Sequence, residues 1–270
     1  MNSVIYYGLM ASLAIIYMIP LIWVLSSSFR TELNMFNPNQ WIPRPATLKN
    51  YYRLFEFLPD FSRYVSNTVI IASLSTIGQL VSCSLAGYAL ARYRFKGRGV
   101  ILFVLIGTLM VPGQVTLIPT FVLFRHLGIL NTRWALIIPA CFGSAYFTFF
   151  FRQYFMNIPR ELEEAAYLDG AGRLRTFISV IVPVARPAFI SLGTLIFVSA
   201  WNGFFLPSVY LMSRKEWVLS QALRALTSQS HSEWGAIMAG VVLASLPMVL
   251  LYLVAQRYLI EGIMFSGLKG

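Results

Sequence analysis

Residues 67–90 read NTVIIASLSTIGQLVSCSLAGYAL, a run of apolar and small residues that contains no Asp, Glu, Lys or Arg. As an α-helix rising about 1.5 Å per residue, this run covers the roughly 30 Å hydrocarbon core of a bilayer. Gly78, Ser82 and Ala86 recur in it at four-residue spacing. Small side chains on one helical face let a second helix approach closely. The run therefore predicts a membrane-spanning helix that packs against another helix of the same bundle.

Five further runs have the same length and character. They extend from Val4 to Leu25, Val100 to Phe121, Trp134 to Phe151, Phe189 to Met212, and Ala236 to Leu253, and none contains Asp, Glu, Lys or Arg. The whole chain of 270 residues is 57% hydrophobic and 11% charged, whereas soluble domains carry about 25% charged residues. We therefore predict an all-α integral membrane protein with six transmembrane helices.

The basic residues give the predicted orientation. The formal net charge of +11 would suggest nucleic-acid binding in a soluble protein, but these residues lie in short loops that suit anionic lipid headgroups. We expect contact with the lipid bilayer and none with nucleic acid. One short loop carries four basic residues and no acid, namely Arg92, Arg94, Lys96 and Arg98. Short basic loops stay in the cytoplasm, so six spans place both termini there. The Lys and Arg residues of the other loops, taken together, hardly favour either orientation.

Two classes of function are disfavoured by residues that the chain lacks. An ion-coupled secondary transporter usually places ionisable residues in its spans, and the six runs contain no Asp, Glu, Lys or Arg. A membrane enzyme needs converging His, Asp, Glu or Cys. Cys83 and Cys141 lie inside apolar runs, while His126 and His231 lie in loops. We therefore expect no metal site, no disulfide and no catalytic activity.

The longest polar segment on the predicted cytoplasmic side extends from Arg152 to Pro187. Pro159 suits the first position of a helix, and the following acidic residues suit the positive end of the helix dipole. Gly170 then predicts a left-handed helix end. A second amphipathic stretch follows and ends at Pro183; its apolar residues are Leu174, Phe177, Ile178 and Ile181. Such a segment either docks another protein or lies on the membrane, and the physical pattern leaves both readings open.

The same segment carries a motif. Glu164, Ala165 and Ala166 are followed by Gly170 and by Val180-Ile181-Val182-Pro183. This order and spacing resemble the EAA signature of permease subunits of ATP-binding-cassette importers, with valine in place of isoleucine and of leucine. The longer stretch from Leu162 to Ala171 resembles the carbohydrate branch of that family. Ala200-Trp201-Asn202 and the residues near the C-terminus agree, so the resemblance extends from about Asn67 to the end.

The resemblance implies a function and partners. The chain would be a non-catalytic permease subunit in a bacterial or archaeal inner membrane, paired with a second permease subunit, two ATP-binding subunits and an extracytoplasmic solute-binding protein. ATP and Mg would be bound by the partner subunits, and no cofactor by this chain. ATP-driven closure of the two ATP-binding subunits would drive alternating access. The chain itself contains no G-x-x-x-x-G-K-[ST] phosphate-binding motif, so ATP hydrolysis must reside in another chain.

The resemblance also assigns residues. The loop at 152–187 would hold a cytoplasmic coupling helix that docks on the ATPase, formed by Leu162, Glu163, Glu164, Ala165, Ala166, Leu168, Asp169 and Gly170. Residues 1–66 would form the first transmembrane helix and an outer loop, and residues 67–270 a five-helix permease core.

The expected solute is a sugar or oligosaccharide, with glycerol phosphate or a polyol as the alternative. A hydroxyl-rich solute needs hydrogen-bonding groups and an aromatic face. Trp201 and Asn202 offer both, near the middle of the predicted fifth span. Helix packing through a buried Asn explains them equally well, so their place in a solute pathway is an open prediction.

Overall fold

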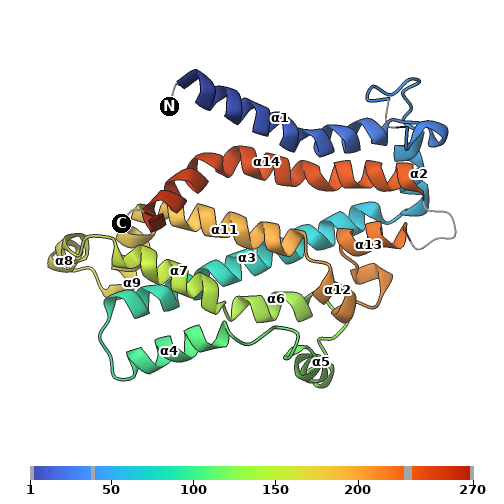
Figure 1. Ribbon diagram of the computed structural model, residues 1–270. Helices are drawn as coiled ribbons and strands as arrows, with labels where there is room; N and C mark the ends of the chain where they lie inside the picture. Colours follow the sequence, from blue (N-terminus) through green and yellow to red (C-terminus); the bar gives the residue numbers. More distant parts are fainter. Residues whose placement is uncertain (1–2, 38–39, 228–232, 268–270) are drawn as a thin grey trace. The chain divides into compact units, whose positions relative to one another are not determined.

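The computed structural model describes residues 3–37, 40–227 and 233–267, which form helices and loops and contain no strand (Figure 1). The chain forms two compact units. One comprises residues 1–65 and 218–249, and the other comprises residues 66–217 and 250–270. The second unit contains the segment from 152 to 187. The expected all-α membrane fold class is confirmed, because several of these helices are long and apolar enough to cross a bilayer.

The first unit joins the N-terminal helix to short outer helices. It contains α1 (Ser3–Ser28), η1 (Glu32–Asn34), α2 (Lys49–Phe57), α13 (Leu219–Ala225) and the start of α14 (Trp234–Gly267). Asn50 donates hydrogen bonds to the carbonyls of Ser28 and Arg30, at 2.9 and 2.8 Å. Arg53 forms ion pairs with Glu32 and Glu233. These polar contacts fix α2 to the end of α1 and to the start of α14.

The second unit carries the rest of the helices. They are α3 (Phe61–Arg92, which starts in the first unit), α4 (Arg98–Thr108), α5 (Leu117–His126), α6 (Trp134–Cys141), α7 (Ala145–Met156), α8 (Glu161–Leu168), α9 (Arg173–Thr176), η2 (Phe177–Ile181), α10 (Val182–Val184), α11 (Arg186–Trp201), α12 (Phe205–Tyr210) and η3 (Arg214–Glu216). A buried core in this unit contains the aromatic residues Tyr88, Phe151, Phe155 and Phe177, together with Ile181. This core joins the C-terminal half of α3 to α7 and η2.

The predicted small-residue face of α3 is in contact with α6 and with the turn after it. A Cβ at Gly78 would lie 3.1 Å from Cα of Cys141, and a Cβ at Gly143 would lie 3.1 Å from Oγ of Ser82. Ala86, the third member of the pattern, is exposed. At the neighbouring Gly87, α3 does lie close to α7, since a Cβ there would be 3.0 Å from backbone atoms of α7. The prediction of a packing face within the bundle is therefore right for two of its three residues.

The count of six spans is not confirmed. Among the described residues, four helices are long and apolar enough to cross a membrane: Ile5–Ser28, Phe61–Arg92, Trp134–Met156 and Trp234–Leu259. A fifth span exists if the bent pair Arg173–Val184 and Arg186–Trp201 counts as one. The run from Trp134 is interrupted at Gly143, which has a φ of +92°, yet its two halves together keep the length of a span.

Two predicted spans are wrong as continuous helices. The run from Val100 to Phe121 divides into α4 and α5, because Pro112 cannot donate a helical hydrogen bond and the residues around it form turns. The run from Phe189 to Met212 divides at Gly203 into α11 and α12. Each break replaces the single helix that hydropathy alone predicts.

Candidate docking site

The predicted short helix in the polar segment is present as α8. It begins at Glu161, and the carbonyl of Arg160 accepts the N–H groups of Glu163 and Glu164 at 2.9 and 3.0 Å. Three glutamates lie in its first turn. Negative side chains are favoured there because the unpaired N–H groups of the first turn carry partial positive charge.

The helix ends as the sequence predicts, at a left-handed glycine. Gly170 has a φ of +78°. Its N–H donates to the carbonyl of Tyr167 at 3.0 Å, and the N–H of Ala171 donates to the carbonyl of Ala166 at 2.9 Å. These two bonds form a Schellman motif, which satisfies carbonyls that the helix end leaves free. The direction in which the chain leaves α8 therefore depends on the backbone conformation of residue 170.

The surface of α8 has two sides. Glu163 and Ala166 are buried, one helical turn apart. The other predicted coupling residues are exposed, namely Leu162, Glu164, Ala165, Leu168, Asp169 and Gly170. Leu168 is 89% exposed, although it is a large apolar residue. The structure thus gathers the predicted residues on one helix and turns six of the eight outward.

Glu163 points into the protein, which the sequence pattern does not indicate. Its Oε1 lies 2.9 Å from Nε of Arg92, and the two side chains are 9% and 4% exposed. Nη2 of Arg92 donates to the carbonyl of Ile158 at 2.5 Å. In the sequence, Arg92 indicates only the orientation of the chain in the membrane. Nothing in the spacing of the chain pairs residue 92 with residue 163, so this contact could not be predicted.

The second amphipathic stretch is helical but sharply bent. Phe177 and Ile181 are buried, while Leu174 and Ile178 are exposed. The segment Arg173–Val184 meets α11 at an angle of 80°. The bend arises because Pro187 has no N–H to donate to the preceding turn.

The predicted solute pair lies at the other end of α11. Trp201 is the last residue of that helix and Asn202 is its C-cap, so both lie at a helix end and not in the middle of a continuous helix. Trp201 is 4% exposed and stacks on Phe197 at 5.9 Å, whereas Asn202 is exposed. A buried packing role therefore fits Trp201 but not Asn202 within this chain. Their role in a solute pathway stays a prediction.

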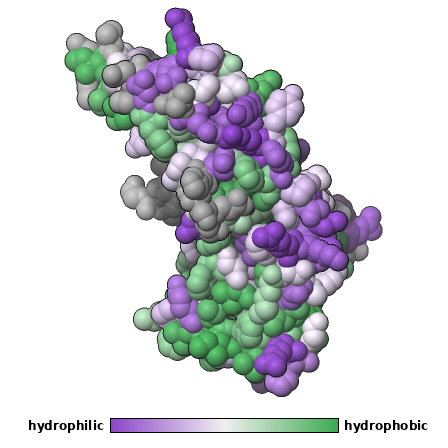
Figure 2. Space-filling model, turned by 90° about the vertical axis from the view of Figure 1, so that its right-hand side faces the viewer, coloured by the Kyte–Doolittle hydropathy of each residue, from purple (hydrophilic) through white to green (hydrophobic). Residues whose placement is uncertain are grey.

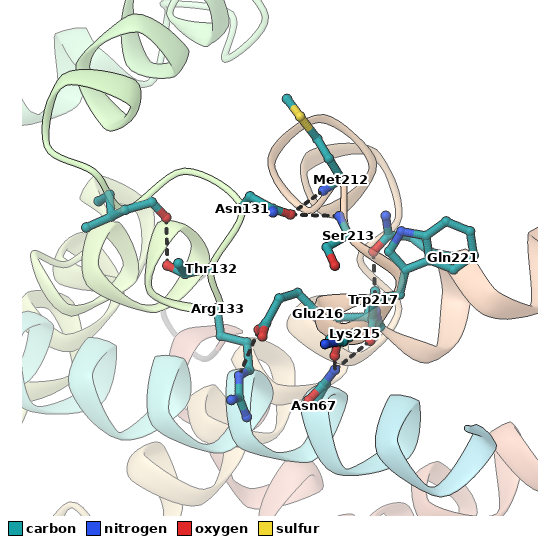
Figure 3. A network of polar contacts seen from close by, with 12 residues as sticks. Asn67, Asn131, Thr132, Arg133, Met212, Ser213, Lys215, Glu216, Trp217 and Gln221 are labelled. Carbon is teal, nitrogen blue, oxygen red and sulfur yellow. Dashed lines mark hydrogen bonds and ion pairs between the residues drawn. The ribbon is translucent and has the colours of Figure 1, made fainter. Parts of the chain in front are cut away.

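A polar network ties the loops at this end together (Figure 3). Oδ1 of Asn131 accepts the N–H groups of Met212 and Ser213 at 2.8 and 2.7 Å. Arg133 pairs with Glu216 at 3.1 Å. Asn67 of α3 donates to two carbonyls near η3. Viewed toward the right-hand side of Figure 1, the surface shows hydrophilic patches between hydrophobic ones (Figure 2).

Comparison with known proteins gives concordant similarities. Residues 83–264 match the family model described as "Binding-protein-dependent transport system inner membrane component". The chain is 34% identical over 263 residues to the trehalose/maltose transport system permease protein MalG of Thermococcus litoralis, covering 96% of this chain and 94% of that protein. It is 31% identical to the arabinooligosaccharides transport system permease protein AraQ of Halalkalibacterium halodurans, with the same coverage.

One solved structure has the same fold over nearly its whole length. It is a chain of a bacterial ABC transporter involved in the import of the acidic polysaccharide alginate, with a TM-score of 0.82 and 24% identity. The match covers 94% of this chain and 95% of that chain.

Proposed function

The chain belongs to the family of binding-protein-dependent transport system inner membrane components, and on this premise we propose that it is the coupling permease subunit of an ATP-driven sugar or oligosaccharide importer. The resemblance to ABC-importer permeases noted in the sequence is thereby confirmed. The proposal adds three things to family membership, namely the solute class, the coupling of transport to a separate ATPase, and alternating access.

The observation that carries the proposal is the outward face of α8. This short helix lies outside the apolar spans and is anchored by one side, while Leu168 and Glu164 on its other side are exposed. An exposed leucine beside an acidic residue is a surface that a protein partner with an apolar cleft and a basic rim could cover. Because the chain lacks a phosphate-binding loop, we assign ATP and Mg to that partner.

The solute class rests on the relatives. Both curated relatives described above are named for saccharides. We propose that Asn202 faces the solute route, because its side chain is exposed where α11 ends. Trp201, which is buried behind it, would support that position. Hydroxyl groups of a sugar are suitable partners for an exposed amide.

The partners follow from the family and from the exposed surface. We propose a second permease subunit, two ATP-binding subunits and an extracytoplasmic binding protein. Helix α1 supports the need for lipid or a second permease, since no residue in its most apolar window is buried within this chain. Helix α4 likewise contains no buried residue. Large exposed apolar areas of this kind are covered by lipid or by another subunit.

The function is tested by Glu164→Lys in the assembled complex. We expect normal insertion of the chain, because Glu164 is exposed and makes no ion pair among the contacts described. Copurification of the ATPase subunit and uptake of sugar should fall together by at least about tenfold, because disrupting a buried charge pair at an interface costs about 2–5 kcal/mol. Both are measured on one preparation, by pull-down and by uptake into proteoliposomes. Loss of uptake through a changed apparent affinity for sugar, with normal ATPase binding, would contradict this proposal.

Orientation is tested separately. We propose that the basic loop from Arg92 to Arg98, the segment from 152 to 187 and both termini face the cytoplasm. Lys96 is exposed, so Lys96→Cys provides a reporter in an accessible loop. We expect this cysteine to resist a membrane-impermeant thiol reagent in intact cells and to react after lysis. Rapid labelling in intact cells would indicate the opposite orientation of the chain. Cys141 is exposed in the isolated chain, so a Cys141→Ser background serves as the control.

A further inference from the structure

We propose that Arg92 and Glu163 form the mechanical link between the coupling helix and the membrane domain, so that α8 and the cytoplasmic end of α3 move as one body. Neither residue would bind the ATPase; both would act as positioning residues for the docking face. This inference rests on the proposed function and adds to it the path by which movement of α8 reaches a spanning helix.

The first observation is the buried charge pair itself. The guanidinium of Arg92 and the carboxylate of Glu163 lie 2.9 Å apart, with side chains 4% and 9% exposed. Two charges removed from water are tolerated when they stay together, whereas either one alone in the same place is strongly unfavourable. The pair therefore resists separation far more than an exposed ion pair, in which water replaces the lost partner.

The second observation is that Arg92 contacts both α8 and the chain that leads into it. One nitrogen pairs with Glu163 in the first turn of the helix, and another donates to the carbonyl of Ile158, just before it. Arg92 is the last residue of α3. Its positive charge suits the C-terminal end of α3, and the negative charge of Glu163 suits the N-terminal end of α8. One side chain therefore fixes the first turn of α8 and the residue at which the chain approaches it.

The third observation is the aromatic packing next to the charge pair. Tyr88, one turn before Arg92, packs against Phe155 of α7 and Phe177 of η2, with ring centroids 5.7 and 4.8 Å apart. The guanidinium of Arg173 lies 5.0 Å from the ring centroid of Tyr93. Aromatic and cation–π contacts therefore hold the end of α3 against α7, α9 and η2.

Adjacent glutamates consequently have different roles. Glu163 is directed inward to α3, and its neighbour Glu164 is directed outward. The same substitution at these two positions separates transmission from docking. Glu163→Gln keeps the size of the side chain and removes the charge that Arg92 requires, while Glu164→Gln is the matched control on the exposed face.

The test uses the reconstituted complex with its ATPase and partner permease. For Glu163→Gln we expect normal copurification of the ATPase subunit, while sugar transported per ATP hydrolysed falls at least about fivefold, the lower end of coupling between distinct sites. For Glu164→Gln we expect weaker copurification. If Glu163→Gln weakens ATPase binding as much as Glu164→Gln, or leaves the transport ratio unchanged, the link is refuted. If Glu164→Gln binds the ATPase normally, the docking proposal fails instead, so the two failures are distinguishable.

Two further measurements cover the case in which Glu163→Gln folds poorly. Glu163→Asp, which keeps the charge that Arg92 requires, should express and retain most of the transport ratio; a Glu163→Asp variant that binds the ATPase but transports no better than Glu163→Gln refutes the link. Spin labels at Ala86 and Glu161, both exposed, report the distance from α3 to α8. We expect one narrow distance distribution with and without ATP in the otherwise wild-type complex. A distance that changes with ATP would show that α8 and α3 do not move together.

Discussion

Gly170→Val is expected to abolish sugar uptake by the assembled importer while leaving the spans intact. Gly170 has a φ of +78° and ends α8 through the Schellman motif. A residue with a Cβ pays roughly 1–2 kcal/mol in this left-handed region, and a β-branched residue is the least suited to it. Valine will therefore move residue 170 to another backbone conformation and unwind the last turn of α8, which carries Leu168.

The control for this experiment lies two residues further on. Gly172 has a φ of −74° and a ψ of 166°, a conformation that valine adopts readily. A Cβ at either glycine meets no atom within 4 Å. The two substitutions therefore differ in backbone strain and not in crowding within the chain. We expect Gly172→Val to retain most uptake and ATPase copurification. If both variants lose uptake and ATPase copurification equally, the cause is the size of the added side chain and not the conformation at the end of the helix.

Leu168→Glu is expected to have the second large effect, an almost complete loss of the ATPase subunit from the complex. Leu168 is 89% exposed in the chain, so a glutamate there is hydrated in the free subunit, and its charge at the end of α8 costs the fold no more than about 1 kcal/mol. In a docked complex the position would be covered. Burying a leucine contributes about 1.5–3 kcal/mol, and an unpaired charge in the same place opposes docking further. Assembly should weaken by about two orders of magnitude, since each 1.4 kcal/mol is tenfold.

Leu168→Met provides the matched control, because it keeps an apolar side chain of similar volume. The measurement is the concentration of ATPase subunit that half-saturates the permease complex in detergent, together with uptake in proteoliposomes. Leu168→Met should behave nearly as the wild type. If Leu168→Glu binds the ATPase normally and transports, then this leucine faces lipid or solvent in the complex, and the docking surface lies elsewhere on the segment.

Local chemistry explains what could be predicted from the sequence. The end of α8 at Gly170 follows from a rule about a single residue, and the polar segment stands out because the runs around it are apolar. The direction of Glu163 could not be predicted in this way. All three glutamates lie in the first turn of α8, and only the contact with Arg92, from which α8 is separated by four helices in the chain, distinguishes Glu163 as the buried one.

Hydropathy also fails at the breaks inside apolar runs. Residues 109–116 are as apolar as a helix requires, so their composition predicts continuity. Pro112 and Gly113 argue for a break, but proline is common in membrane helices and often produces only a kink. Whether the chain turns or merely bends depends on tertiary contacts that satisfy the freed backbone groups, and these contacts are not visible in composition. The same reasoning applies to Gly203, which lies in the break between α11 and α12.

The bend of 80° between α10 and α11 has a consequence for the bilayer. If α11 crosses the bilayer, the bend turns the segment Arg173–Val184 toward the membrane plane over about 18 Å at the usual helical rise. Its exposed Leu174 and Ile178 can enter the boundary between headgroups and acyl chains. In the orientation that we propose, this segment would occupy extra area in the cytoplasmic leaflet, and lateral pressure in that leaflet would act on the angle of the bend. Lipids with small headgroups and lipids with large headgroups should therefore change the bend angle differently.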